Sequence, residues 1–273
     1  MSLYFEISGA GPDLVLLHGW GLNLKVWDRL RASLSNRFRT IALDLPGHGR
    51  SPWSPSRSTP AEQTWLIHET LASVSTRYTL VGWSLGGQIA LDLAAATPSQ
   101  VEKLVLIATT PKFTFGPGWE HGMPAAALTR MAAQLQDNYK RTVSKFLELQ
   151  VRGSAHGDAV LAELRSALAA QGEATQSALT GGLERLTNAD LRDTLPHVAA
   201  PTLVIAGQHD RITPASGAKA LARALPNGRY VEIRRAAHAP FLSHTKDLIR
   251  ALDRFLLGDN VETAEPRREC ARG

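Results

Sequence analysis

The stretch Gly82-Trp83-Ser84-Leu85-Gly86 decides how this chain folds. It follows the apolar run Tyr78–Gly82 and opens the Ala-rich helical pattern Leu85–Ala96, so it predicts a tight turn from a strand into a helix. Glycine two residues before and two residues after Ser84 lets the backbone bend sharply without collision. A serine held on such a turn is a candidate nucleophile.

Short apolar runs alternate with helical patterns on both sides of this turn. The apolar runs predict strands at Leu14–Leu17, Thr40–Leu45, Val101–Ala108, Thr202–Ala206 and Arg229–Ile233. The periodic segments predict helices at Leu24–Leu34, Ala61–Ser75, Ala215–Ala224 and Leu248–Leu257. This alternation predicts an α/β protein whose mostly parallel sheet carries helices on both faces.

The rhythm changes between residues 111 and 195, where helical patterns occur without a convincing strand. They cover Ala125–Gln136, Tyr139–Val151, Asp158–Ala170 and Gln176–Leu186. We therefore expect an α/β core formed by residues 1–110 and 196–258, interrupted by a helical cap insertion at 111–195. Residues 259–273 are polar and aperiodic, and we expect no regular structure there.

Composition excludes several classes of function. The 273 residues are 44% hydrophobic and 20% charged, as in ordinary globular proteins. Cys270 is the only cysteine, which excludes a disulfide framework and a cysteine-based metal site. The sequence shows no apolar run long enough to cross a membrane and no secretory signal, so we expect a cytoplasmic protein that makes no membrane contact. We also expect a monomer.

The formal net charge of +5 raises the possibility of an acidic partner. Residues 130–152 carry Arg130, Lys140, Arg141, Lys145 and Arg152 against Asp137 and Glu148. No motif typical of nucleic-acid binding accompanies these charges, so we expect no nucleic-acid partner. Taken alone, the charges predict solvated helix faces.

A serine hydroxyl needs a neighbouring base to take its proton. Of nine histidines, His238 in Ala236-Ala-His-Ala-Pro-Phe241 comes just after the last predicted strand, where loops gather at the carboxyl edge of the sheet. Asp210 follows the strand Thr202–Ala206 in the same way and can fix the tautomer of the histidine. We therefore predict a catalytic triad of Ser84, Asp210 and His238.

Other polar residues near strand ends have simpler explanations. His209 is a rival base, but it is adjacent to Asp210, and neighbouring residues do not readily present their side chains to each other. His18 and His48 flank glycine turns and are expected to brace loops. Asp44 ends a strand before Ser84, and we expect it to brace the following Pro46–Gly49 turn.

Acyl transfer also needs donors for the developing oxyanion. The backbone N–H of Leu85, directly after the candidate nucleophile, is one expected donor. The second is expected from His18-Gly19-Trp20-Gly21, with the N–H of Trp20 as the choice. We also expect the indoles of Trp20 and Trp83 to line an apolar acyl pocket.

With these motifs in place, residues 3–257 resemble the α/β-hydrolase family. The resemblance is carried by His18-Gly-Trp-Gly21, by Asp44-Leu-Pro-Gly-His-Gly-Arg-Ser51 and by Gly82-Trp-Ser-Leu-Gly-Gly87. Within it, the chain is most similar to the esterases that act on the methyl ester of pimeloyl-[acyl-carrier protein] in biotin synthesis. The specific part of this similarity lies in the predicted cap, at Arg141-Thr-Val-X-X-Phe146, Leu149-Gln150, Gly181-Gly-Leu-Glu184 and Asp190-Leu-Arg192.

The resemblance implies a carboxylesterase that releases methanol and needs neither cofactor nor metal. It implies an acyl carrier protein as partner, contacted by Arg141 and Lys145, and Phe146 as a substrate-binding residue. Two further basic positions of the family's cap fall on Asp158 and Ala162, a departure that bears on the strength of carrier binding; Arg152 and Arg165 are candidates to compensate.

Three other functions use the same residues. A general short-chain carboxylesterase or lactonase would act without a carrier. A non-catalytic protein of the same fold would hold a ligand without turnover, although such proteins often lack a triad member. A cofactor-free haloperoxidase-like activity would employ the same triad.

Overall fold

The computed structural model describes residues 2–258, in which one seven-stranded sheet forms the centre of the molecule. Its strands are β1 (Phe5–Ser8), β2 (Asp13–Leu17), β3 (Arg39–Leu43), β4 (Tyr78–Trp83), β5 (Val101–Ile107), β6 (Thr202–Gly207) and β7 (Gly228–Ile233). They lie in the order β1-β3-β2-β4-β5-β6-β7. Among the strands of this sheet, as described over residues 2–258, only β1 and β3 pair antiparallel, so the predicted mostly parallel sheet is confirmed. The predicted tail at 259–273 lies outside the described residues.

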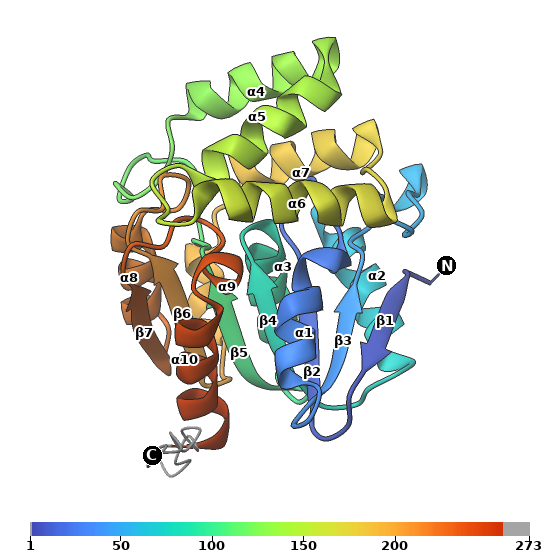
Figure 1. Ribbon diagram of the computed structural model, residues 1–273, viewed down its shortest axis with the longest axis vertical. Coiled ribbons are helices and arrows are strands. Elements are labelled where there is room, and N and C mark those ends of the chain that lie inside the picture. The colour runs from blue at the N-terminus through green and yellow to red at the C-terminus, as the bar shows by residue number, and fades with distance from the viewer. Residues whose placement is uncertain (1, 259–273) are drawn as a thin grey trace, which may run out of the picture.

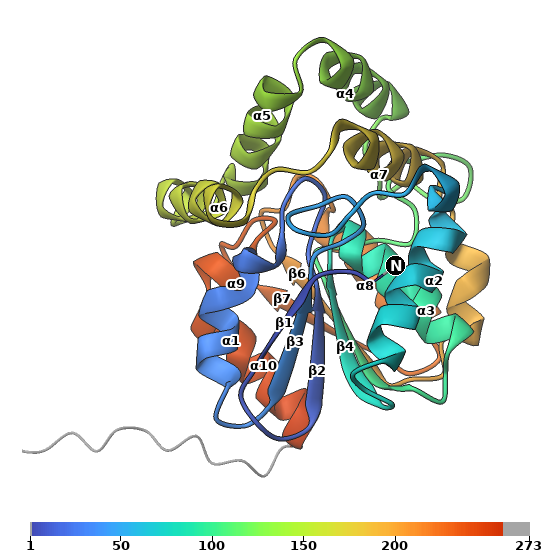
Figure 2. The same cartoon turned by 90° about the vertical axis from the view of Figure 1, so that its right-hand side faces the viewer.

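Helices cover both faces of the sheet. One face carries α1 (Asp28–Leu34), α9 (Pro240–Ser243) and α10 (Thr245–Leu257), and the other carries α2 (Pro60–Ala72), α3 (Leu85–Ala96) and α8 (Ala215–Ala224) (Figure 2). Three short 3-10 helices complete the layers at Leu24–Trp27, Pro55–Arg57 and Arg192–His197. This is the doubly covered arrangement that a parallel sheet requires, because both of its faces are apolar.

Four further helices lie beyond the carboxyl ends of the strands. They are α4 (Ala125–Asp137), α5 (Tyr139–Val151), α6 (Gly157–Gln171) and α7 (Gln176–Asn188). Figure 1 shows them stacked above the strand arrowheads, with α6 and α7 nearest to the sheet. Each coincides with a predicted helix to within two residues, and we refer to this group as the cap helices.

Two differences from the predicted elements have identifiable causes, one local and one set by a distant strand. The segment predicted as a helix from Leu24 begins as a 3-10 turn, capped by Asn23 Oδ1 accepting from the N–H of Lys25, and becomes α-helical at Asp28. The edge strand β1 was not predicted. It has only four residues and is defined by pairing with β3, with Ile7 opposite Ile41, which lies 34 positions away.

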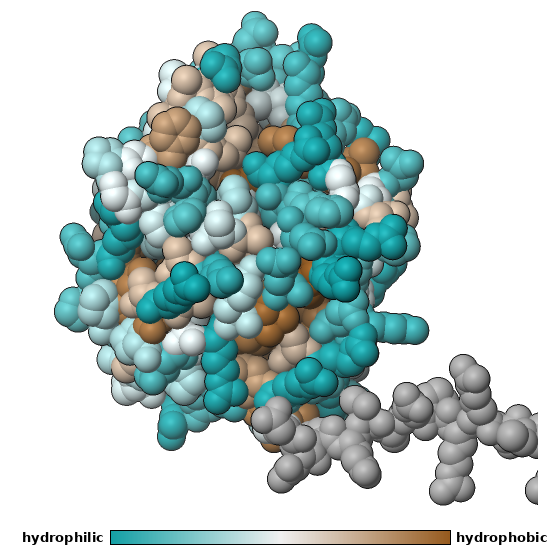
Figure 3. Space-filling model, turned by 90° about the vertical axis from the view of Figure 1, so that its left-hand side faces the viewer, coloured by the Kyte–Doolittle hydropathy of each residue, from teal (hydrophilic) through white to brown (hydrophobic). Residues whose placement is uncertain are grey.

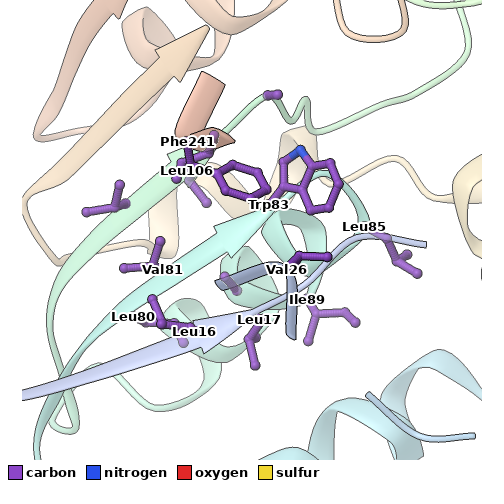
Figure 4. Packing of buried hydrophobic residues seen from close by; sticks show 14 of the residues in the cluster. Leu16, Leu17, Val26, Leu80, Val81, Trp83, Leu85, Ile89, Leu106 and Phe241 are labelled. Atoms are coloured by element: carbon purple, nitrogen blue, oxygen red, sulfur yellow. The ribbon is translucent and has the colours of Figure 1, made fainter. Parts of the chain in front are cut away.

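The core lies between the sheet and its helices and is dominated by leucine, valine and isoleucine. Figure 4 shows the part of it nearest the turn after β4, where the rings of Trp83 and Phe241 lie side by side, with Leu106 beside Phe241 and with Val81 and Leu80 below. Burying a large apolar side chain contributes about 1.5–3 kcal/mol. The turn at Ser84 is therefore anchored in the buried core of the fold.

The face made by β7, α8 and α10 is covered mainly by hydrophilic side chains, with apolar residues between them (Figure 3). A groove of about 350 Å³ runs there between β7 and α10, above Leu203, Val231 and Phe255. Leu203 is the second residue of β6, so this groove lies toward the amino ends of the strands. It is remote from the edge that carries Ser84.

Candidate active site

Ser84 stands at the turn between β4 and α3 with φ 55° and ψ −117°, a backbone conformation that disfavours L-residues. The glycines on either side make the turn possible. A Cβ on Gly82 would lie 2.4 Å from the carbonyl oxygen of Gly86, and one on Gly86 would lie 2.4 Å from that of Leu17. Strain of this kind costs about 1–3 kcal/mol and persists where the surrounding structure enforces it.

The structure brings the three predicted triad residues together. His238 Nε2 lies 3.0 Å from Ser84 Oγ, and His238 Nδ1 lies 2.8 Å from Asp210 Oδ2. The exposed fractions of Ser84, His238 and Asp210 are 2%, 1% and 6%. The three side chains therefore form a continuous hydrogen-bonded chain that is shielded from solvent.

The protonation pattern follows from the acceptors. An ionised carboxylate can only accept, so Nδ1 of His238 carries the hydrogen and donates it to Asp210. The lone pair of Nε2 is then directed at Ser84 Oγ. Asp210 is itself fixed by the N–H groups of Ile212 and Thr213, which donate to Oδ1 over 2.8 and 3.0 Å. This arrangement can accept a proton from the serine and stabilise the resulting charge.

Two backbone N–H groups near Ser84 are free to bind an anion. Leu85 is the first residue of α3, and the first N–H groups of a helix have no partner within it. Within residues 2–258, neither the Leu85 N–H nor that of Trp20 donates a hydrogen bond. The side chain of Ser84 packs close to this loop, since a Cβ on Gly19 would lie 3.4 Å from that of Ser84. Both groups remain proposed oxyanion donors.

Trp20 and Phe146 close the site from the cap side. Their rings meet edge to face at a centroid distance of 5.1 Å, and Trp20 Nε1 donates to the carbonyl of Leu179 in α7 over 2.8 Å. A Cβ on Gly182 would lie 2.6 Å from Trp20 Cδ1 and 3.4 Å from Leu85 Cδ2. The cap helices thus pack directly on the residues that flank Ser84.

The indole of Trp83 was expected to line an acyl pocket, but it lies in the core instead. Its ring packs in the core against Trp27 and Phe241, at centroid distances of 6.4 and 4.9 Å, and is 1% exposed. Its Nε1 donates to the backbone carbonyl of His238 over 2.8 Å. The residue before Ser84 therefore holds the loop that carries His238.

The expected loop-bracing histidines are confirmed. His18 Nδ1 donates to the carbonyl of Gly19, and its Nε2 accepts from the N–H of Leu45. His48 Nδ1 donates in the same way to the carbonyl of Pro46. Burial lowers the pKa of His18 to about 4, and burial together with the neighbouring His18 lowers that of His48 to about 3. Both imidazoles are therefore neutral at pH 7 and hold their loops by hydrogen bonds to the backbone.

Asp44 and His209 also take the places predicted for them. Asp44 accepts from the N–H groups of Leu24 and Arg50, each over 2.8 Å, which braces the turn after β3. His209 is exposed, and its Nδ1 donates to the carbonyl of Gly153 over 2.7 Å. It takes no part in the hydrogen bonds of the triad.

Arg141 and Lys145 lie on the outer face of α5, one helical turn apart. Both are exposed, and neither side chain makes an ion pair within the described chain. Arg165, by contrast, pairs with Glu148 over 3.0 Å. Asp158 and Ala162 are exposed on α6. The outer face of α5 therefore presents two unneutralised cations.

A cavity of about 170 Å³ lies between α5, α6 and Gly21. Its wall includes the apolar side chains of Val143, Leu147 and Leu179, and Lys140 and Arg165 also line it. Gly21 follows Trp20, so the cavity ends beside the loop that carries a candidate oxyanion donor.

Sequence reasoning missed Thr213, whose hydroxyl bonds to Asp210. Its position three residues after an aspartate at a strand end is typical of turns in which a side chain binds local backbone and hydroxyl groups.

Among residues 2–258 there is no cluster of three His, Cys, Asp or Glu side chains with metal-binding geometry, and no helix there has the length and apolarity needed to cross a membrane.

The fold and the buried hydrogen-bonded chain of Ser84, His238 and Asp210 are typical of the α/β hydrolases, and a family model confirms this class of protein. The model of the alpha/beta hydrolase fold matches residues 12–245, and the protein belongs to this family. It is 41% identical over 253 residues, covering 92% of this chain and 98% of the relative, to the pimeloyl-[acyl-carrier protein] methyl ester esterase of Nitrosomonas europaea. It is 38% identical over 256 residues to the protein of the same name from Stenotrophomonas maltophilia, covering 94% of this chain and 97% of that one.

Solved structures agree on the fold. A hydrolase from Pseudomonas aeruginosa superposes with a TM-score of 0.76 at 29% identity, covering 92% of this chain and 93% of that one. An esterase from Exiguobacterium antarcticum superposes with a TM-score of 0.85 at 24% identity, covering 93% and 95%.

Proposed function

We propose that this protein is a serine carboxylesterase that hydrolyses the methyl ester of pimeloyl-[acyl-carrier protein] to the free acid and methanol. The observation that carries the proposal is the hydrogen-bonded chain from Ser84 through His238 to Asp210 beneath the cap helices. Relatives with the corresponding name are 38–41% identical over more than nine-tenths of the chain. The names of these relatives indicate the substrate, and the hydrogen-bonded chain indicates how an ester would be hydrolysed.

The first step is attack on the ester carbonyl. His238 Nε2 takes the proton of Ser84 as Oγ bonds to the carbonyl carbon, and Asp210 stabilises the imidazolium that forms. The tetrahedral intermediate collapses, and His238 gives the proton to the departing methoxide. Methanol leaves, and the acyl group remains on Ser84.

The second step repeats this chemistry with water. His238 takes a proton from a water molecule as its oxygen attacks the acyl-enzyme, then returns the proton to Ser84 as the acid departs. In both steps the oxyanion would be held by the N–H groups of Leu85 and Trp20. Loss of one such donor typically costs about 2.7–4 kcal/mol in the barrier.

The cap helices offer a route for the acyl chain. The cavity beside Gly21 is apolar at Val143, Leu147 and Leu179, which suits a hydrocarbon chain. Phe146 of α5 packs on Trp20 in the loop beside Ser84, so these two rings would contact the end of the chain nearest the ester. A substrate carried on a long flexible arm would enter from the cap side while its bulky carrier stays outside.

The outer face of α5 suits an acidic carrier. Arg141 and Lys145 are exposed and unneutralised, which favours attraction of a negatively charged surface at long range. Asp158 and Ala162 leave α6 without matching cations, so α5 would supply most of this attraction.

The test is hydrolysis of purified pimeloyl-[acyl-carrier protein] methyl ester, followed by mass spectrometry of the carrier. The wild type should remove one methyl group, while Ser84→Ala should neither turn over the ester nor be labelled by a serine-directed phosphonate. Complementation of a biotin-requiring strain that lacks the esterase should give growth only with the wild type. Full activity of Ser84→Ala would refute the assignment of the nucleophile.

Hydrolysis of free short-chain esters without hydrolysis of the carrier-bound ester would instead identify a general carboxylesterase.

A further inference from the structure

Thr213 contacts the acid of the triad through both its backbone and its side chain. Its hydroxyl donates to Asp210 Oδ2 over 2.7 Å and lies 3.4 Å from His238 Nδ1. The residue is completely buried. It lies on the loop between β6 and α8, three residues after Asp210. The side chain is thus wedged at the junction between the acid and the base.

The two oxygens of Asp210 are held differently. Oδ1 accepts from the N–H groups of Ile212 and Thr213, and these bonds depend on the loop backbone alone. Oδ2 accepts from His238 Nδ1 and from the Thr213 hydroxyl. Among the described residues, the Thr213 hydroxyl is therefore the one side-chain donor to Asp210 besides the base itself.

We propose that Thr213 is a positioning residue, whose hydroxyl orients Oδ2 of Asp210 toward Nδ1 of His238; this inference rests on the proposed function of the triad. The last torsion of an aspartate is broad, and the two backbone donors restrain it at Oδ1 alone, so a donor on Oδ2 adds a separate restraint on the oxygen that meets His238. A short O–H···O⁻ bond to the second oxygen restricts that rotation. The base is then held ready before substrate arrives, which lowers the reorganisation needed during reaction.

The hydroxyl also shares the negative charge that His238 uses. Oδ2 divides its acceptor capacity between the Thr213 hydroxyl and the imidazole. Removing the hydroxyl leaves more of the charge on Oδ2 to stabilise the protonated, imidazolium form of His238. That form must lose its proton before His238 can act as base. The acidic limb of the pH profile of kcat/KM should therefore move to higher pH.

The experiment compares Thr213→Val with Thr213→Ser, using p-nitrophenyl acetate as the substrate. Valine keeps the size and branching of threonine but lacks the hydroxyl, whereas serine keeps the hydroxyl. We expect Thr213→Val to lower kcat about 10-fold with KM within twofold of the wild type, and to shift the acidic limb to higher pH. We expect Thr213→Ser to stay within threefold of the wild type in kcat, with an unmoved limb.

Thr202→Val is the matched control. Thr202 is also fully buried, and its hydroxyl donates to the carbonyl of Ala200 over 2.9 Å, at the start of β6 and away from the triad. It should leave kcat and the pH profile unchanged. If Thr213→Val does not fold, Thr213→Ala against Thr213→Ser makes the same comparison, since these two side chains differ by one hydroxyl.

A Thr213→Val enzyme with kcat within twofold of the wild type and an unmoved acidic limb would overturn the proposal. So would equal losses in the serine and valine variants, because those would indicate packing. The small ester keeps this test separate from the choice of natural substrate. Failure of the wild type on the carrier-bound ester would refute that substrate while leaving the Thr213 comparison intact.

Discussion

Arg185 in cap helix α7 donates to Asp92 in core helix α3, with Nη2 2.5 Å from Oδ2. The Arg185 side chain is 4% exposed, and that of Asp92 is 28% exposed. A buried cation of this kind is stable only while its partner is present. The pair therefore joins the cap helices to α3, the helix that begins directly after Ser84.

Asp92→Ala should lower the free energy of unfolding by about 2 kcal/mol, because it leaves a buried guanidinium without its carboxylate. The double variant Asp92→Ala/Arg185→Met should recover most of that loss, since the unpaired charge is gone. Urea denaturation of the wild type, of the single variants Asp92→Ala and Arg185→Met, and of the double variant measures the coupling. The exposed pair Arg77–Glu102 is the control, and Glu102→Ala should cost less than about 1 kcal/mol. Equal costs at the two sites would contradict the argument.

Ser84→Gly should be more stable than Ser84→Ala by about 1 kcal/mol, because the positive φ of this residue suits glycine alone. Both variants lack the hydroxyl, so the comparison isolates the backbone. Equilibrium urea curves at one pH suffice. Identical midpoints would show that the turn carries no strain at this position.

The stability of the fold should decline as the pH falls below 6.5. The pKa values of His18 and His48 are lowered by burial to about 4 and about 3, while the unfolded chain titrates near the ordinary value of 6.5. The unfolded state therefore binds more protons between these limits. The stabilisation is complete above pH 6.5 and is lost as the pH falls toward 4 and 3, at about 1.4 kcal/mol per pH unit for each histidine.

Unfolding free energies at pH 7, 6 and 5 measure this slope. His48→Gln should have a shallower slope by about one proton, although it is less stable at pH 7. His197→Gln, at an exposed position, is the control variant. A His48→Gln slope equal to that of the wild type would show that His48 is not neutral in the fold.

Charge reversal on α5 should affect the carrier-bound ester selectively. Arg141→Glu/Lys145→Glu should lower kcat/KM for pimeloyl-[acyl-carrier protein] methyl ester at least 10-fold, and more at low ionic strength, because it converts attraction into repulsion. Turnover of p-nitrophenyl acetate should change less than twofold.

Lys219→Glu/Arg223→Glu makes the same change of charge at the same spacing on α8, which belongs to the core. This control should leave both activities unchanged. Equal losses in the α5 and α8 variants would mean that net charge, and not the face of α5, governs carrier binding.

Much of the site follows from local sequence. Ser84 could be placed because Gly82 and Gly86 mark a turn between an apolar run and a helical pattern. Asp210 and His238 could be placed because residues after parallel strands meet at one edge of the sheet. The fold class, the positions of the triad residues and the loop-bracing roles of His18 and Asp44 all depend on such short-range patterns.

The remaining features depend on contacts between distant segments. The indole of Trp83 packs into the core because Trp27 and Phe241 approach it from elements 56 and 158 residues away. No periodicity shows on which side of β4 that ring lies. The bond from Trp20 to Leu179 and the pairing of β1 with β3 are likewise set by tertiary packing.

Residues 83 and 84 grip His238 from two sides, since the indole of Trp83 binds its backbone carbonyl and the hydroxyl of Ser84 faces its ring. Two consecutive residues, the last of β4 and the one after it, thus fix the position of His238, which lies more than 150 residues later in the chain. A displacement of the end of β4 would therefore act on the hydroxyl of Ser84 and on the loop of His238 at the same time, and not on one of them alone.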